Sequence, residues 1–151
     1  MPQQTVKLQR YETSVDRVGL AIAAGGLMGG AIAATMMAFA GSTVGAIAMA
    51  VLVGTIMTAL AITALAAIPW ALLHATGRRG PLNAAMLGAI IGFLLFLGGQ
   101  TWGYGLFAMP AMDMSTLVFR WASGIATSLV MAAMSAGVAV VMWRVAYRRV
   151  A

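Results

Sequence analysis

Residues 87–99 read LGAIIGFLLFLGG, an apolar run that contains no charged side chain. Polar and apolar residues do not alternate along it, so it does not suit a strand of a membrane β-barrel. The other structure that satisfies its own backbone hydrogen bonds in hydrocarbon is the α-helix. The run therefore predicts a helix that crosses a bilayer.

The rest of the chain repeats this pattern. Charged residues make up 8% of the 151 residues, against about 25% in a soluble domain. Apolar stretches longer than the roughly 18 residues of a membrane span lie at residues 18–40, 44–73, 82–107 and 115–143. We expect an all-α fold, an integral membrane bundle of four transmembrane helices in one domain (18–143). A basic tail at residues 144–151 follows it.

The N-terminal segment, residues 1–17, is expected to be amphipathic and cytoplasmic. If it is helical, one of its faces carries an apolar stripe that suits a membrane surface or a partner, formed by Leu8, Tyr11, Val15 and Val18. Thr13 and Asp16 have the spacing of a capping box, in which the side chains and backbone N–H groups of a helix start satisfy each other. We therefore expect the first helix to begin here, just before the membrane.

Glycine and proline mark the connection between the second and third stretches. Gly77 suits the end of one helix, and Pro81 suits the first turn of the next. Pro69 lies inside the second stretch and has no backbone N–H to donate. We expect a kink or an early end of that helix near Ile68.

The positive charges predict an orientation. Eight cations fall on one side of a four-span arrangement and only Arg120 falls on the other; the eight are Lys7, Arg10, Arg17, Arg78, Arg79, Arg144, Arg148 and Arg149. The positive-inside rule then puts both termini in the cytoplasm, with the chain in a bacterial inner membrane. Aromatic residues agree with this, with Tyr11, Trp70, Trp143 and Tyr147 at the inner interface and Trp102, Tyr104 and Trp121 at the outer one.

The positive charges do not indicate a nucleic-acid partner. The pI is about 11.3, but no basic run is interleaved with aromatics as a nucleic-acid groove requires. We expect membrane lipids as partners and no nucleic acid. The chain has no cysteine, which removes disulfides and thiolate metal sites from consideration.

Small residues recur four apart on all the predicted helices, most densely in the AGGLMGG of residues 24–30. A phosphate-binding glycine loop would need a preceding strand and an aqueous edge, which this apolar stretch does not provide. Rows of small residues let helices approach closely in lipid. Either the four helices pack against each other through these rows, or another subunit or copy packs there; the rows are Gly25, Gly26, Gly29, Gly30, Ala34, Gly54, Gly88, Gly92, Gly124 and Gly137.

Three further features carry candidate chemistry. His74 is the only histidine and could bind a haem or pigment, although a histidine that caps helix carbonyls is the simpler interpretation. Met109, Met112 and Met114 have thioethers of the kind that select Cu(I), although methionine also fills apolar gaps. Arg120 could snorkel to the headgroups or pair with Asp113.

No set of residues predicts catalysis, because the serines have no intramembrane histidine base and the three acids lie apart. We therefore do not expect an enzyme. The leading hypothesis is a non-catalytic accessory or structural subunit of a larger membrane complex, packed through its small-residue faces, with bound lipid as the expected small molecule. The alternatives are a small, self-associating, holin-like pore-former and a membrane carrier for a small solute or copper.

Overall fold

The computed structural model describes residues 10–103 and 113–150. Within these residues, four helices are long and apolar enough to cross a membrane, at Val15–Phe39, Val44–Ala75, Pro81–Trp102 and Met114–Ala146. The predicted helical architecture with four such helices is confirmed. In chain order the elements are β1 (Arg10–Glu12), α1 (Val15–Phe39), α2 (Val44–Ala61), η1 (Ile62–Ala66), α3 (Ala67–Ala75), α4 (Pro81–Gly98), η2 (Gly99–Gly103), α5 (Met114–Ala146) and β2 (Arg148–Val150).

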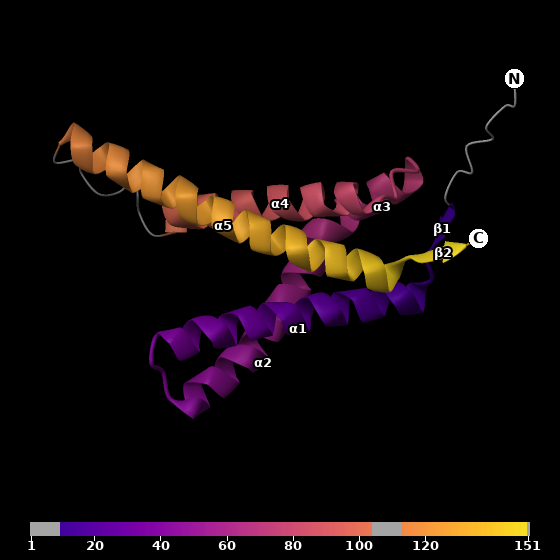
Figure 1. Cartoon of the computed structure of the whole chain (residues 1–151), viewed down its shortest axis with the longest axis horizontal. Helices are drawn as coiled ribbons and strands as arrows, with labels where there is room; N and C mark the ends of the chain where they lie inside the picture. The colour runs from indigo at the N-terminus through magenta and orange to yellow at the C-terminus, as the bar shows by residue number, and fades with distance from the viewer. Residues whose placement is uncertain (1–9, 104–112, 151) are drawn as a thin grey trace, which may run out of the picture.

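The helices form two hairpins. The α1 helix packs along α2, α4 packs along α5, and the two hairpins meet mainly through α1 and α5. Figure 1 shows the hairpins converging at the end that holds β1 and β2 and diverging at the opposite end. The continuous span of α2, η1 and α3 crosses from the first hairpin to the side of α4.

Glycines set the closeness of the α1–α2 hairpin. A Cβ atom on Gly30 would lie 2.6 Å from the Val51 carbonyl oxygen, and one on Gly26 would lie 3.0 Å from that of Thr55. In the other hairpin, a Cβ on Gly88 would lie 2.7 Å from the Ser135 carbonyl oxygen. These backbones therefore approach to distances that no larger residue permits.

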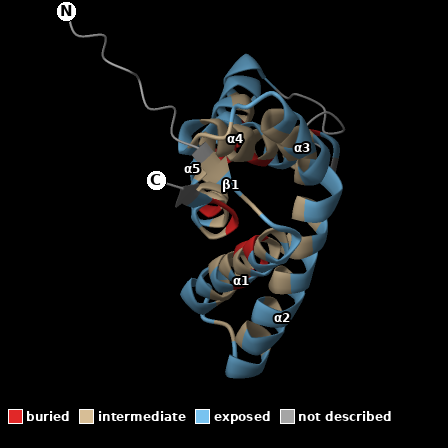
Figure 2. Ribbon diagram, turned by 90° about the vertical axis from the view of Figure 1, so that its right-hand side faces the viewer, coloured by how far each residue is buried: buried red, intermediate tan, exposed pale blue. Residues whose placement is uncertain are grey.

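Few side chains are buried, because the elements are thin hairpins rather than a thick bundle. Figure 2 shows the buried residues on α1, α4 and α5, while α2 has none. Large apolar side chains such as Leu52, Ile68 and Phe119 are exposed. An apolar surface of this extent suits hydrocarbon surroundings better than water.

Helix ends follow local rules. Gly77 has a φ of +75° and closes α3, its N–H donating to the His74 carbonyl while that of Arg78 donates to the Leu73 carbonyl. This Schellman arrangement and the place of Pro81 at the first turn of α4 confirm both predictions. The first helix begins one residue later than predicted, because Ser14 rather than Thr13 is the N-cap and accepts from the Arg17 N–H.

The second span does not end at Pro69. Instead, the π-helical turn η1 precedes the proline, and α3 continues through it. In a regular helix the Pro69 ring would clash with the carbonyl of the residue four positions earlier, to which it can donate no hydrogen bond. A wider turn at that point removes the conflict, since one-turn π-bulges widen a helix locally. The predicted irregularity is present, about one turn earlier than expected.

The chain ends pair with each other. Strands β1 and β2 are antiparallel, with Tyr11 opposite Arg149. The expectation that Tyr11 lies on a helical stripe is therefore wrong, because Tyr11 belongs to a strand that pairs with β2. Leu8 lies outside the described residues.

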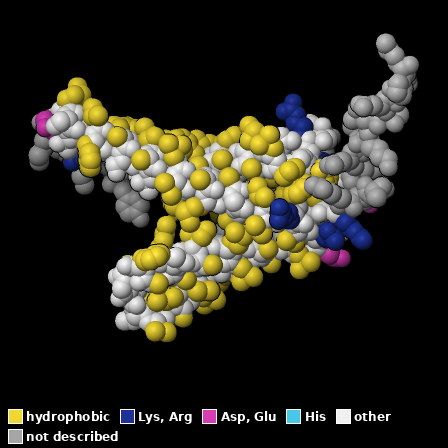
Figure 3. Space-filling model, in the orientation of Figure 1, with side chains coloured by type: hydrophobic (Ala, Val, Ile, Leu, Met, Phe, Trp, Pro, Cys, Tyr) yellow, Lys and Arg dark blue, Asp and Glu magenta, His cyan; other side chains and the backbone are white. Residues whose placement is uncertain are grey.

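Most cations gather at this end of the molecule, as Figure 3 shows. We call it the basic end, which among the described side chains carries Arg17, Arg78, Arg79, Arg144 and Arg148.

Candidate functional site

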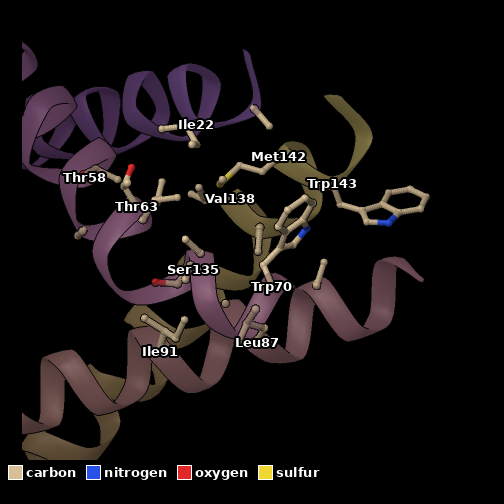
Figure 4. Close-up of a pocket in the computed structure, with 18 of the residues that line it drawn as sticks. Ile22, Thr58, Thr63, Trp70, Leu87, Ile91, Ser135, Val138, Met142 and Trp143 are labelled. Carbon is tan, nitrogen blue, oxygen red and sulfur yellow. The ribbon is translucent and has the colours of Figure 1, made fainter. Parts of the chain in front are cut away.

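An apolar cavity of about 500 Å³ lies between the two hairpins. All six helical segments from α1 to α5, η1 included, contribute to its wall. Figure 4 shows Ile22 and Met142 on one side of it, Ile91 on the other, and Trp70 toward one end. Segments that are distant in the sequence therefore build the cavity together.

Small residues create this space. Ala21 of α1, Ala66 of η1, Ala84 of α4 and Ala139 of α5 all line the cavity. Short side chains at positions where two hairpins face each other leave room that neither fills. The π turn also contributes to the wall, through Ile62, Thr63 and Ala66.

The wall presents hydrocarbon rather than reactive groups. Among the described residues that line it, hydroxyls come from Thr58, Thr63 and Ser135, and none of the lining side chains is charged. The Thr63 hydroxyl donates to the Ala59 carbonyl of its own helix at 2.8 Å. Such a wall can bind apolar groups and holds no acid–base pair for chemistry.

Aromatic side chains surround the cavity toward the basic end. The Tyr147 ring is buried and lies 6.1 Å from both Trp70 and Trp143, which also line the cavity. Tyr11 of β1 lies 5.3 Å from Trp143 in an edge-to-face arrangement. We call Tyr11, Trp70, His74, Trp143 and Tyr147 the aromatic cluster; edge-to-face and offset rings of this kind attract each other beyond their burial.

Hydrogen bonds connect the cluster to both hairpins. The His74 Nδ1 atom lies 3.0 Å from the Tyr147 hydroxyl. The Trp143 indole N–H donates to the Arg79 carbonyl at 2.7 Å, and the Arg79 guanidinium donates to the carbonyls of His74 and Tyr11, each at 3.2 Å. Burial raises the pKa of the Tyr147 phenol above its ordinary value.

The sequence placed four of these aromatics at one interface, and the structure brings the same four together. The distribution of charges and aromatics along the sequence does not show that these side chains touch. Tyr11 and Tyr147 are brought together where β1 pairs with β2. His74, which the sequence singled out as a possible cofactor ligand, is a member of the cluster. Its Nδ1 is engaged by a tyrosine hydroxyl.

The other ligating candidates are the methionines that precede or begin α5 in the sequence. Met109 and Met112 are outside the described residues, so the thioether hypothesis stays a prediction; Met114, the first residue of α5, is exposed. Among the residues that the structure describes, no group of three His, Cys, Asp or Glu side chains could hold a metal ion.

Asp113 serves as the N-cap of α5. Its carboxylate accepts from the Ser115 hydroxyl at 2.6 Å and from the Thr116 N–H at 3.0 Å, and these hydrogen bonds lower the pKa of the carboxyl. Within the described residues no ion pair joins it to Arg120, which is half-buried on α5.

Most of the small-residue rows face neighbours within the chain. Gly25 faces Met142 and Ile62, at the wall of the cavity, whereas Gly137 of α5 faces open space. The remaining members lie in helix contacts or are at least half-buried: Gly26, Gly29, Gly30, Ala34 and Gly54 in the first hairpin, and Gly88, Gly92 and Gly124 in the second. The sequence could not indicate which neighbour each row faces.

Comparison with protein-family models, curated proteins and solved structures finds no match to this chain.

Proposed function

We propose that the chain is a non-catalytic membrane protein that holds an apolar molecule, or the apolar part of one, in the cavity between its hairpins. The observation that carries this proposal is the cavity itself. Its volume of about 500 Å³ falls within the roughly 300–1,000 Å³ of ligand pockets, which are mostly apolar with a few polar groups. In this proposal the chain lies in a bacterial inner membrane with the basic end in the cytoplasm.

The size of the cavity supports an occupant. If the space stayed empty, the side chains that line it would lose packing partners on one side, and lost contacts of this kind destabilise a protein. Water is a poor occupant because apolar cavities offer it too few hydrogen-bond partners. Hydrocarbon from the bilayer or from a solute fills the space without that loss.

The proposal can be tested by quenching of tryptophan fluorescence, since Trp70 and Trp143 line the cavity. The probe is a detergent with a brominated alkyl chain, added to the full chain with Trp102 and Trp121 changed to Phe. We expect saturable quenching that Ala66→Leu reduces, because Ala66 lines the cavity. Ala64→Leu is the matched control, since Ala64 belongs to the same turn but is exposed and does not line the cavity. Equal, non-saturable quenching in both variants would contradict the proposal.

A second candidate, the accessory subunit of a larger complex, is favoured by one exposed face of α5. A Cβ atom on Gly137 would meet nothing within 4 Å, and Ala133, one turn away, is also exposed. Small residues four apart let a partner helix approach closely in lipid. Gly137→Leu should therefore abolish copurification of other subunits in mild detergent; a chain that always purifies alone contradicts this candidate.

A further inference from the structure

The depth of the cavity along the helix axes matches one leaflet of a bilayer. Its lining runs from Ala84 to Gly92 on α4, from Ser135 to Ala146 on α5, and from Met57 to Ala71 along the second span. At 1.5 Å per residue these segments are about 12, 17 and 21 Å long. The hydrocarbon core of a bilayer is about 30 Å thick, so half of it is about 15 Å. A partner helix would need the full thickness, whereas a lipid acyl chain needs the depth of its own leaflet.

Cations lie beside the end of this cavity, where a headgroup would be. Arg17 directly precedes the lining residue Val18, and its guanidinium donates to the carbonyl of Val145, next to the lining residue Ala146. That hydrogen bond is long, at 3.5 Å. Arg79 is held next to Trp143, which donates to its carbonyl. Within residues 10–103 and 113–150, the hydrogen bonds of both guanidinium groups go to neutral carbonyls and none goes to a carboxylate.

The acids at this end form no salt bridge with the two arginines in the described structure. They are Glu12 of β1 and Asp16 of α1, and both are exposed. A cationic edge on an apolar cavity is complementary to an amphiphile with an anionic head. Basic pockets between membrane helices on the cytoplasmic side bind anionic headgroups in this way.

We infer that the occupant is an anionic phospholipid of the leaflet at the basic end, with one acyl chain in the cavity and its phosphate group beside Arg17 and Arg79. The inference rests on the proposed function and adds the chemistry of the ligand. In this arrangement Trp70 and Trp143 lie between the acyl chain and the phosphate headgroup of the lipid, at the membrane interface where amphipathic aromatic rings are favoured.

The test is native mass spectrometry of the full chain in detergent after incubation with phosphatidylglycerol, phosphatidylcholine or palmitate. We expect phosphatidylglycerol to be retained better than phosphatidylcholine. Arg17→Gln should reduce the retention of phosphatidylglycerol about fivefold, which is the contribution of one cation near a membrane surface. Retention of phosphatidylcholine should not change. Arg144→Gln is the matched control, because Arg144 is an exposed cation at the same end whose guanidinium forms no hydrogen bond within the described residues, whereas Arg17 is partly buried and hydrogen-bonds to α5.

The outcomes separate the two proposals. The headgroup inference is overturned if the two phospholipids are retained equally, or if Arg17→Gln and Arg144→Gln have equal effects. The proposal of an apolar ligand in the cavity still stands in that case if the tryptophan quenching is saturable. Stronger retention of palmitate than of phosphatidylglycerol would replace the phospholipid by a free fatty acid. Ala66→Leu should lower the retention of both phospholipids, and Ala64→Leu should lower neither. Helix content measured by circular dichroism checks that each variant is folded.

Discussion

Replacing Gly30 by alanine tests whether the first hairpin is as tightly packed as the structure shows. The added Cβ atom would lie 2.6 Å from the Val51 carbonyl oxygen, a backbone atom that cannot turn aside. Ordinary contact begins at 3.4 Å, so α1 and α2 must separate by about 0.8 Å at this point. We expect this separation to destabilise the hairpin.

The magnitude follows from two opposing effects. A gap of 0.5–1 Å removes roughly a quarter to a half of the attraction of each atom pair, and overpacking typically destabilises by about 1–3 kcal/mol. Alanine in place of glycine within a helix contributes about 0.5–1 kcal/mol in the opposite direction. Gly19→Ala is the matched control on the same helix, because a Cβ there meets nothing within 4 Å. The two variants share the helix term and differ by the packing term, so Gly30→Ala should be about 1–3 kcal/mol less stable than Gly19→Ala.

The assay is unfolding in mixed detergent micelles, followed by tryptophan fluorescence and by circular dichroism. Each variant is compared with the unmodified chain in the same micelles, so that differences in unfolding free energy are measured. If Gly30→Ala and Gly19→Ala prove equally stable, α1 and α2 do not approach through Gly30. The glycine row on α1 then does not set the spacing of the first hairpin.

Two further predictions concern hydrogen bonds at the helix ends. Tyr147→Phe removes the hydroxyl next to His74 Nδ1 and should lower the free energy of unfolding by about 0.5–1.5 kcal/mol at pH 7. Burial raises the pKa of Tyr147 above its ordinary value of 10.0, so the unfolded chain loses this proton at a lower pH than the folded chain does. The free energy of unfolding should therefore fall as the pH rises above that value, and it should fall less steeply in Tyr147→Phe. Parallel pH profiles of the two proteins would count against this burial effect. Asp113→Ala should destabilise α5, whereas Asp113→Asn should retain most of the stability, since asparagine also caps helices well. Hydrogen bonds from Ser115 and Thr116 lower the pKa of the Asp113 carboxyl. The stability that Asp113 contributes should therefore be present above its ordinary pKa of 3.8 and be lost as the pH falls below that value. Thermal melts recorded at a series of pH values measure this loss.

The sequence was informative where the structure depends on neighbouring residues. Gly77 ends α3 because the left-handed conformation there suits a residue without a Cβ, and Pro81 begins α4 because its missing N–H is not needed in a first turn. Pro69 predicted an irregularity in the second span, since proline has no backbone N–H to donate to the carbonyl four residues earlier. Pro69 alone does not show whether the helix ends early or continues through a wider turn. That outcome depends on contacts with distant residues, such as those between α3 and α4.

The candidate site was much harder to foresee. Tyr11 belongs to a strand of three residues whose partner lies at the other end of the chain. No local pattern indicates such a pairing, and a periodic stripe of apolar residues suggested a helix instead. The membership of His74 in the aromatic cluster has the same cause, because its partner Tyr147 is distant in sequence.

Small residues have two different consequences in this chain, and the difference lies in what faces them. Gly26 and Gly30 face the backbone of α2, so their lack of a side chain draws two helices together. Ala66 and Ala139 line the cavity, so their short side chains leave space between helices. In water the hydrophobic effect would favour closing such a gap, but lipid tails are as apolar as the wall, so closure brings no comparable gain. A cavity of this kind is therefore stable where hydrocarbon can fill it, which is why its presence between helices of membrane-spanning length argues for a lipid-like occupant.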